Sequence, residues 1–252
     1  MRILLTNDDG IGAVGLRALY AALRAAGHTV HVVAPMQEQS AVGHSLTVFQ
    51  PLRSRVVKDG DFHGIGIHGT PTDCVKLALH TLVPERPDMV ISGINAGANV
   101  GPDILYSGTV AAATEGAHSG LPALAVSHDD FHPGDLAEYA SHAASLLPSL
   151  PWDKLPPRCL LNLNYPRCPL REAKPLAVCP QTSAVWADSY VEGRDPRGNP
   201  YWWLTGVIPP EQIEPGSDRD LLTRGHVTLT PLHFDFTAHA SMEALRAAVS
   251  AL

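Results

Sequence analysis

The alternation of strand-like and helix-like segments over residues 1–150 limits the possible folds more than any other feature of the sequence. Apolar, β-branched runs at residues 2–6 and 28–35 enclose a segment in which Leu16, Leu19 and Leu23 recur at helical spacing. Three further strand-like runs follow: GIGIHG, DMVISG and PALAVS. Strands that alternate with helices are typical of a parallel sheet with helices on both faces. We therefore predict an α/β fold.

Helix boundaries in this part of the chain support the same fold. Thr70 is a good capping residue, Pro71 suits the first helical position, and Asp73 favours the positive end of the helix dipole. We predict a helix over residues 71–82. A run of small residues predicts another over about 110–119.

The sequence changes in character after residue 150. Thirteen of its 22 prolines fall in residues 151–252, where they separate short apolar runs. This pattern predicts an antiparallel, β-rich extension that ends in a helix over about 238–252. We interpret residues 1–252 as one domain, with a core at 1–150 and an extension at 151–252 that serves oligomerisation.

The charge balance and the pattern of apolar residues exclude several classes of protein. Lys and Arg number 18 against 25 Asp and Glu, a net charge of −7, which disfavours binding to a nucleic-acid duplex. No uncharged apolar run reaches the ~18 residues that a membrane span needs. The first ten residues lack the pattern of a signal peptide, so we expect a cytoplasmic protein. The four cysteines show no C-x-x-C spacing, and we expect buried free thiols rather than disulfides or a zinc site.

Two adjacent carboxylates, Asp8 and Asp9, follow the first predicted strand. In open parallel sheets ligands bind beyond the carboxyl ends of the strands, and paired carboxylates there repel each other unless a cation binds them. A solvated turn is the alternative. The loops at residues 39–45 and 93–101 add hydroxyl and amide oxygens, a donor set that suits Mg²⁺, Mn²⁺ or Ca²⁺.

The glycines Gly10, Gly12 and Gly15 match the G-x-G-x-x-G pattern of dinucleotide-binding proteins. A pyrophosphate there would lie beside Asp8 and Asp9 without neutralisation. The acidic ribose partner is also missing at the end of the second strand, where Glu38 is the nearest candidate. A nicotinamide-dependent oxidoreductase stays open as an alternative.

Ser107, Gly108 and Thr109 precede the helix of small residues. Free backbone N–H groups and hydroxyls at a helix start can bind phosphate, although a simple helix cap is the alternative. The histidine-containing segment 128–132 could resemble a metal loop, but its position before a helix favours an exposed turn.

Five segments in order along the chain resemble the SurE family, the stationary-phase survival nucleotidases. They are NDDG with the following A-x-G-L, QSAVGHSLT, GTPTDCV, SGINAGANVG and YSGTVAAATEG, and later segments extend the resemblance to about residue 237. The resemblance implies a Rossmann-like, mostly parallel sheet. One departure is Arg219-Asp220, where the family more often has small residues, which leaves the base preference open.

The resemblance also implies a divalent-metal-dependent phosphatase that acts on nucleoside 5′- and 3′-monophosphates, and in some members on short polyphosphate. It implies one divalent cation per subunit, Mg²⁺ or Mn²⁺, held by the residues that match Asp8, Asp9, Ser40 and Asn95. We expect either aspartate to act as a base. The other expected substrate contacts are Asn99, Ser107, Gly108 and Thr109 on phosphate oxygens, with His44 as a candidate general acid. A non-catalytic nucleotide-binding module is a second alternative.

Five aromatic residues lie outside the alternating pattern, between residues 185 and 206: Trp186, Tyr190, Tyr201, Trp202 and Trp203. Aromatic side chains on an extension are typical interface anchors, and the alternative is that they fold back on their own subunit. Members of the resembled family are dimers or tetramers with exchanged extensions. We therefore predict a homodimer or homotetramer.

Overall fold

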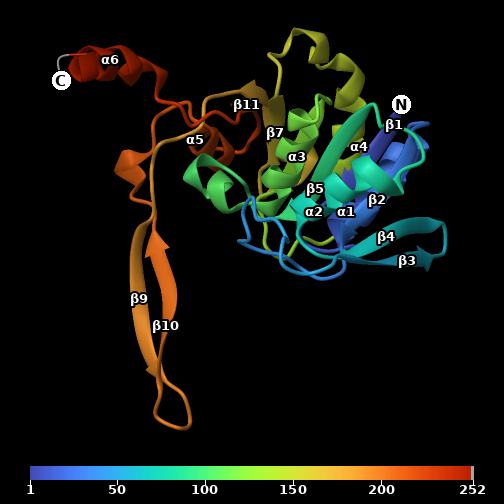
Figure 1. Cartoon of the computed structure of the whole chain (residues 1–252), viewed down its shortest axis with the longest axis horizontal. Coiled ribbons are helices and arrows are strands. Elements are labelled where there is room, and N and C mark those ends of the chain that lie inside the picture. The colour runs from blue at the N-terminus through green and yellow to red at the C-terminus, as the bar shows by residue number, and fades with distance from the viewer. Residues whose placement is uncertain (251–252) are drawn as a thin grey trace.

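The computed structural model describes residues 1–250, and one large sheet forms the centre of the molecule (Figure 1). Within these residues the sheet has nine strands. In spatial order they are β3 (Arg53–Asp59), β4 (Phe62–His68), β2 (Thr29–Pro35), β1 (Arg2–Thr6), β5 (Met89–Ala96), β6 (Ala123–His128), β7 (Cys159–Tyr165), β11 (His226–His233) and β8 (Lys174–Val178). The six strands from β4 to β7 run parallel to one another, which confirms the α/β prediction, and β3 is antiparallel to β4 at the edge of the sheet.

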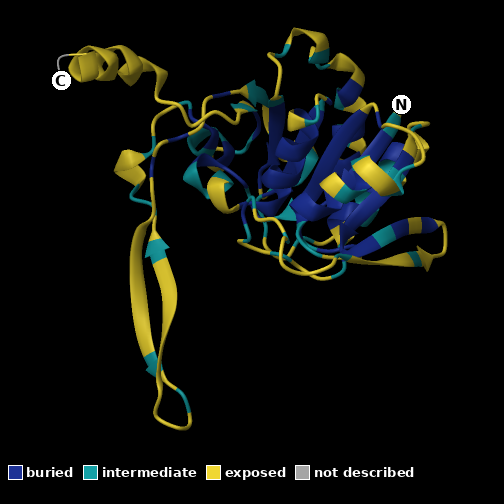
Figure 2. Cartoon of the chain, viewed as in Figure 1, coloured by how far each residue is buried: buried dark blue, intermediate teal, exposed yellow. Residues whose placement is uncertain are grey.

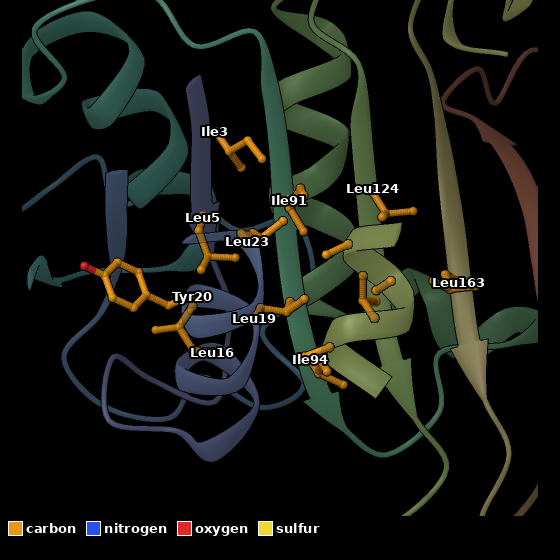
Figure 3. Packing of buried hydrophobic residues seen from close by; sticks show 14 of the residues in the cluster. Ile3, Leu5, Leu16, Leu19, Tyr20, Leu23, Ile91, Ile94, Leu124 and Leu163 are labelled. Atoms are coloured by element: carbon orange, nitrogen blue, oxygen red, sulfur yellow. The ribbon is translucent and has the colours of Figure 1, made fainter. Parts of the chain in front are cut away.

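Apolar side chains of the central strands are buried on both faces of the sheet. Ile3 and Leu5 of β1 pack on one face with α1 (Val14–Ala25) and α4 (Ala137–Leu146), as Figure 3 shows for α1. Leu4 points to the other face, which α2 (Pro71–Leu77) and α3 (Gly108–His118) cover. Burial on both faces explains why these strands are almost wholly apolar.

The helix that was predicted over residues 71–82 forms with its predicted cap. The Thr70 hydroxyl accepts a hydrogen bond from the Asp73 backbone at 3.1 Å, and the Asp73 carboxylate accepts one from the Thr70 backbone at 2.9 Å. A π-helical turn, η1 (Ala78–Leu82), continues α2 to the predicted end. Helix α3 begins two residues before its predicted start, because Ser107 caps it by accepting from the Val110 backbone.

The region after residue 150 is not wholly antiparallel, contrary to the sequence prediction. β7 pairs in parallel with β6 and so continues the central sheet, and its residues are buried almost throughout. β11 is antiparallel to β7 and parallel to β8. The prolines lie between these strands more than within them, so they mark loops without revealing strand direction.

Two strands, β9 (Ala187–Arg194) and β10 (Pro200–Val207), form an antiparallel hairpin that projects from the body; we call it the arm (Figure 1). Its residues are almost all exposed (Figure 2), including Trp202 and Trp203. Four of the five aromatic side chains, those of Tyr190, Tyr201, Trp202 and Trp203, therefore do not fold back on the body, whereas Trp186 donates its indole N–H to Asp103.

The remaining helical elements are short, apart from the one near the C-terminus. α5 (Asp218–Thr223) precedes β11, and α6 (Met242–Ser250) forms the later part of the helix predicted over 238–252, whose residues 251–252 lie outside the described part. Short 3₁₀ helices occur at η2 (Gly101–Tyr106), η3 (Leu147–Ser149), η4 (Trp152–Lys154), η5 (Leu170–Glu172), η6 (Pro210–Gln212) and η7 (His239–Ser241).

Two further predictions from the sequence can be compared with the structure. Over residues 1–250, no helix combines the length and the apolar character that crossing a bilayer requires. All four cysteines are free thiols, as predicted. Cys74 and Cys179 are buried as expected, whereas Cys159 and Cys168 are only partly covered, contrary to the prediction.

Candidate active site

A cavity of about 530 Å³ lies where β1 and β5 end, and we call it the aspartate cavity. Its walls come from segments that are distant in the sequence: the loops after β1 and β2, the segment from β5 into α3, and the turn after β6. The polar residues that line it include Asp8, Asp9, Glu38, Ser40, Asn95 and Asn99. The structure thus brings together all four residues that the family resemblance indicates as metal ligands.

Asp8 lies at the bottom of this cavity, with 6% of its surface exposed. The Thr109 hydroxyl donates a hydrogen bond to its Oδ1. Helix α3 can approach so closely because residue 108 is glycine: a Cβ there would lie 2.8 Å from the Asp8 Cβ. Burial raises the pKa of Asp8, and the Thr109 hydroxyl and the backbone amides of Gly108 and Thr109 oppose that shift.

Asp9 is more open to solvent than Asp8 and receives a hydrogen bond from the Ala96 backbone N–H at 3.0 Å. Burial, with a further contribution from the negative charge of Asp8, raises the pKa of Asp9 to about 7. Two adjacent carboxylates in a partly dry cavity are costly to ionise together. A bound cation would remove that cost, so this pair fits a metal site.

Ser40 and Asn95 supply neutral oxygens to the same cavity. The Asn95 amide nitrogen donates to the Gly97 carbonyl at 2.7 Å, which leaves Oδ1 directed toward the Thr109 hydroxyl, 3.4 Å away. Ser40 is exposed, and its hydroxyl donates to the Glu38 carboxylate at 2.5 Å. An oxygen of each side chain therefore retains acceptor capacity.

The donor set consists of oxygens alone. Among residues 1–250, no group of three His, Cys, Asp or Glu side chains is arranged to hold a metal ion. A metal in the aspartate cavity would therefore need the amide and hydroxyl oxygens besides the two carboxylates. Such a set fits a hard divalent cation such as Mg²⁺ or Mn²⁺.

The residues expected to contact phosphate fall into two groups. Asn99 and Ser107 line the aspartate cavity, and Ser107 can still donate its hydroxyl proton because its oxygen acts as the acceptor for the Val110 backbone. Thr109 is fully buried and its hydroxyl is directed to Asp8. The Thr109 hydroxyl was expected to bind phosphate, but in the structure it is hydrogen-bonded to the Asp8 carboxylate.

His44 does not line the aspartate cavity, which is contrary to its expected role as general acid. Its Nε2 lies 2.7 Å from Glu115 of α3, which also binds Lys76 at 3.1 Å. His44 instead lines a neighbouring cavity of about 700 Å³ that shares Ser107 with the aspartate cavity. Sequence position alone could not reveal this, because the side chain of a loop residue can point either way.

The glycine pattern has a structural explanation that needs no dinucleotide. A Cβ on Gly15 would lie 2.0 Å from the carbonyl oxygen of Ile94, so glycine lets α1 pack directly on β5. Glu38, the nearest candidate for a ribose partner, is turned toward Ser40. Gly15 thus serves helix–strand packing, and Gly10 has a φ of +98° that favours glycine, whereas a Cβ on Gly12 would meet no other atom.

Sequence reasoning missed several residues of the aspartate cavity, among them Asp103, Tyr106 and Phe131. Asp103 accepts hydrogen bonds from Arg219 and, at 2.7 Å, from the Trp186 indole. Arg219, which departs from the residues typical of the resembled family, therefore contacts the aspartate cavity through the cavity-lining residue Asp103. Phe131 belongs to the segment 128–132. Residues 129–132 of that segment are partly covered or exposed, which confirms the expected turn, whereas His128 is buried at the end of β6.

Comparison with known proteins agrees with this geometry. The model of the family described as "Survival protein SurE" matches residues 3–188. A protein of Desulfovibrio desulfuricans named 5′-nucleotidase SurE is 64% identical over 251 residues, which cover 98% of each chain. Another of that name, from Nitratidesulfovibrio vulgaris, is 62% identical over 97% of this chain and 91% of its own.

A solved structure extends the agreement to three dimensions. The crystal structure of the SurE protein from Aquifex aeolicus superposes with a TM-score of 0.84 at 35% sequence identity, covering 99% of this chain and 100% of the other. The family model spans well over half of the chain, and the relatives span nearly all of it. On these grounds the chain belongs to the SurE family.

Proposed function

We propose that this protein is a divalent-metal-dependent phosphomonoesterase that releases phosphate from nucleoside 5′-monophosphates. The observation that carries the proposal is the pair of adjacent carboxylates, Asp8 and Asp9, in a cavity that also holds Asn95 and Ser40. Relatives at 60% identity and above bear the name 5′-nucleotidase. Nucleoside 3′-monophosphates and short polyphosphate are further proposed substrates.

Asp8, Asp9, Ser40 and Asn95 would hold one divalent cation per subunit, Mg²⁺ or Mn²⁺. When bound, such a cation supplies charge neutralisation for the two carboxylates and polarisation of the phosphoryl group. The raised pKa of both aspartates supports this assignment, since they are groups that a cation would stabilise in the ionised form.

The two aspartates are suited to different tasks. Asp8 is nearly enclosed, and Thr109 and the start of α3 surround its carboxylate. Asp9 is more accessible than Asp8, which suits a group that accepts a proton from an attacking water. We assign the role of base to Asp9 and a purely ligating role to Asp8.

Ser107 and Asn99 line the aspartate cavity and are the proposed phosphate contacts. Gly108, also expected there, faces the Asp8 carboxylate instead. Ser107 has a free proton to donate. Asn99 is held by its neighbours: its Nδ2 donates to the Ser127 hydroxyl and its backbone N–H to the Asn164 side chain, both at 2.8 Å. Fixed donors of this kind stabilise charge on a phosphoryl group without reorganising during the reaction.

A chelator experiment separates this function from its two alternatives. After treatment with EDTA, phosphate release from AMP should stop and should return on addition of Mg²⁺ or Mn²⁺. A nicotinamide-dependent oxidoreductase would instead reduce or oxidise its cofactor with or without EDTA. A binding module would bind AMP with no turnover at all, and either result would contradict the proposal.

We further propose that the protein is a homodimer or homotetramer joined through residues 151–252, the extension to the core at 1–150. The arm supports this proposal, because exposed aromatic side chains on a projecting hairpin are costly in water and are typical interface anchors. A cytoplasmic location stays a prediction from the sequence.

A further inference from the structure

Two exposed aromatic rings lie on the wall of the aspartate cavity, and we call them the aromatic rim. They belong to Tyr106, at the end of η2, and Phe131, in the turn after β6. Phe131 is 78% exposed and Tyr106 is 65% exposed, whereas Asp8 in the same cavity is 6% exposed. The cavity thus has an ionic bottom and an apolar opening.

The Phe131 ring rests on Gly97, which directly follows β5, the strand whose end carries Asn95. A Cβ on Gly97 would lie 2.7 Å from the ring, so the ring covers the backbone at that residue. The Gly97 carbonyl is the group that accepts from the Asn95 side chain, and the Gly97 N–H donates to the His128 carbonyl at 2.9 Å. The Phe131 ring therefore lies against Gly97, the residue whose carbonyl orients the side chain of Asn95, a proposed metal ligand.

A hydrogen bond and an ion pair to the end of β7 and the residues after it hold the turn that carries Phe131. The Asp129 backbone donates to the Tyr165 carbonyl at 2.9 Å, and Asp130 binds Arg167 at 3.3 Å. The Asp130 carboxylate also accepts from the His132 backbone at 3.1 Å. These contacts hold the Phe131 ring at the edge of the cavity, with nothing from residues 1–250 covering most of its surface.

We propose that the aromatic rim, and Phe131 above all, is the stacking surface for the nucleobase of the substrate. This inference rests on the proposed function and adds the part of the substrate that distinguishes a nucleotide from other phosphate esters. A phosphate bound near Asp8 and Asp9 directs the rest of the molecule toward the opening, where the rim lies. The volume of about 530 Å³ falls within the range of small-ligand sites. Stacking on an aromatic ring accepts any base, because every base has a π-face.

The test compares AMP with ribose 5-phosphate, which is the same ester without the base. In Phe131→Ala, the ratio of kcat/KM for AMP to kcat/KM for ribose 5-phosphate should fall about tenfold, mostly through KM for AMP. Phe131→Trp should keep the wild-type ratio. Phe49→Ala is the matched control, since Phe49 is fully exposed and does not line the cavity. Inhibition by the product adenosine should weaken in Phe131→Ala to a similar extent.

Each other outcome counts against the inference in a distinct way. A ratio in Phe131→Ala within twofold of the Phe49→Ala control would overturn the stacking role and leave the proposed function intact. A changed mass of Phe131→Ala in light scattering would assign the ring to a contact between subunits instead. If the wild-type protein hydrolyses neither ester, the proposed function fails and this inference fails with it.

Discussion

The hydroxyl of Thr109 is hydrogen-bonded to the buried carboxylate of Asp8, which links the first turn of α3 to the end of β1. Valine has nearly the same shape as threonine but cannot donate. We expect Thr109→Val to lower both the affinity for Mn²⁺ and kcat/KM by about ten- to a hundredfold, as for the loss of a partner behind a metal ligand. Calorimetric titration with Mn²⁺ measures the first effect directly.

Thr114→Val is the matched control for this change. Thr114 is also buried in α3, but its hydroxyl donates to the Val110 carbonyl of its own helix at 2.8 Å. It should bind Mn²⁺ as the wild type does. Equal Mn²⁺ affinity in Thr109→Val and Thr114→Val would contradict the supporting role of Thr109.

Replacing either aspartate should abolish activity without unfolding the chain. Asp8→Asn and Asp9→Asn keep the shape of the side chain but remove a charged ligand or the base, so a loss of about a hundredfold or more in kcat is expected. Asp61→Asn, outside the aspartate cavity, serves as the control. Steady-state kinetics measures the loss of kcat, and circular dichroism checks that the variants are folded. Near wild-type turnover in both cavity variants would contradict the assignment of Asp8 and Asp9 to the active site.

The raised pKa of Asp9 predicts how metal affinity depends on pH. Below about pH 7 a proton competes with the cation for the Asp9 carboxylate, so the affinity should fall up to tenfold per pH unit as the pH is lowered from 7 to 5. Above pH 8 the curve should flatten. Titration calorimetry in buffers of different ionisation enthalpy should also detect proton release near pH 6.5, and a flat profile between pH 5 and 8 would exclude the shift.

The same shift has a consequence for the stability of the metal-free protein. The folded-state pKa of Asp9 is above its unfolded value, so the folded state binds the proton more tightly and the free energy of unfolding falls as the pH rises from about 4 to about 7. At pH 8 without metal, Asp9→Asn should therefore be more stable than the wild type, by about 1–3 kcal/mol. Urea unfolding with EDTA present measures this difference. The advantage should shrink at pH 5 and vanish on addition of Mn²⁺.

His44 should contribute to loop stability more than to proton transfer. Because its ring binds Glu115 outside the aspartate cavity, His44→Ala should lower kcat less than tenfold, whereas loss of a general acid costs about 10²–10⁴-fold. The acid and base limbs of the pH–rate profile should keep their positions. A loss above a hundredfold that abolishes one limb would restore His44 as the general acid.

Association through the arm predicts a mass that depends on its aromatic residues. Light scattering at micromolar concentration should give at least twice the 26.9 kDa of one chain. A double Trp202→Ser and Trp203→Ser variant should shift the mass toward that of a smaller assembly. A wild-type mass that stays at 26.9 kDa as the concentration rises would exclude association.

The sequence was sufficient for the elements with strong local patterns. The apolar runs of β1, β2, β5 and β6 and the cap at Thr70 depend on neighbours in the chain, so periodicity reveals them. The pairing of β7, β11 and β8 joins segments far apart in sequence, and nothing local specifies which strands meet or in which direction. The prediction of a wholly antiparallel extension was wrong for this reason.

In the candidate active site, too, the location of residues could be predicted from the sequence, whereas the direction of their side chains could not. Asp8 and Asp9 follow β1, and Asn95 lies at the end of β5. Both strands end at one edge of a parallel sheet, so the proximity of these residues can be predicted from the strand order alone. The directions of His44 and Thr109 depend on loop conformation and on helix packing at Gly108, which the sequence does not reveal. Phe131 was missed because an exposed aromatic in a polar turn carries no local pattern.

The order of strands across the sheet also bears on how the polypeptide acquires its structure during synthesis. β11 is the last strand to leave the ribosome, yet it is inserted between β7 and β8. Within residues 1–250, β8 is an edge strand whose one neighbour is β11. β8 is therefore synthesised well before it can be paired, and until then β7 is itself an open edge. A chain that ends before residue 226 lacks β11, so β7 keeps only β6 as a neighbour and β8 has none. Nascent fragments of this length are therefore expected to be targets for chaperones and proteases.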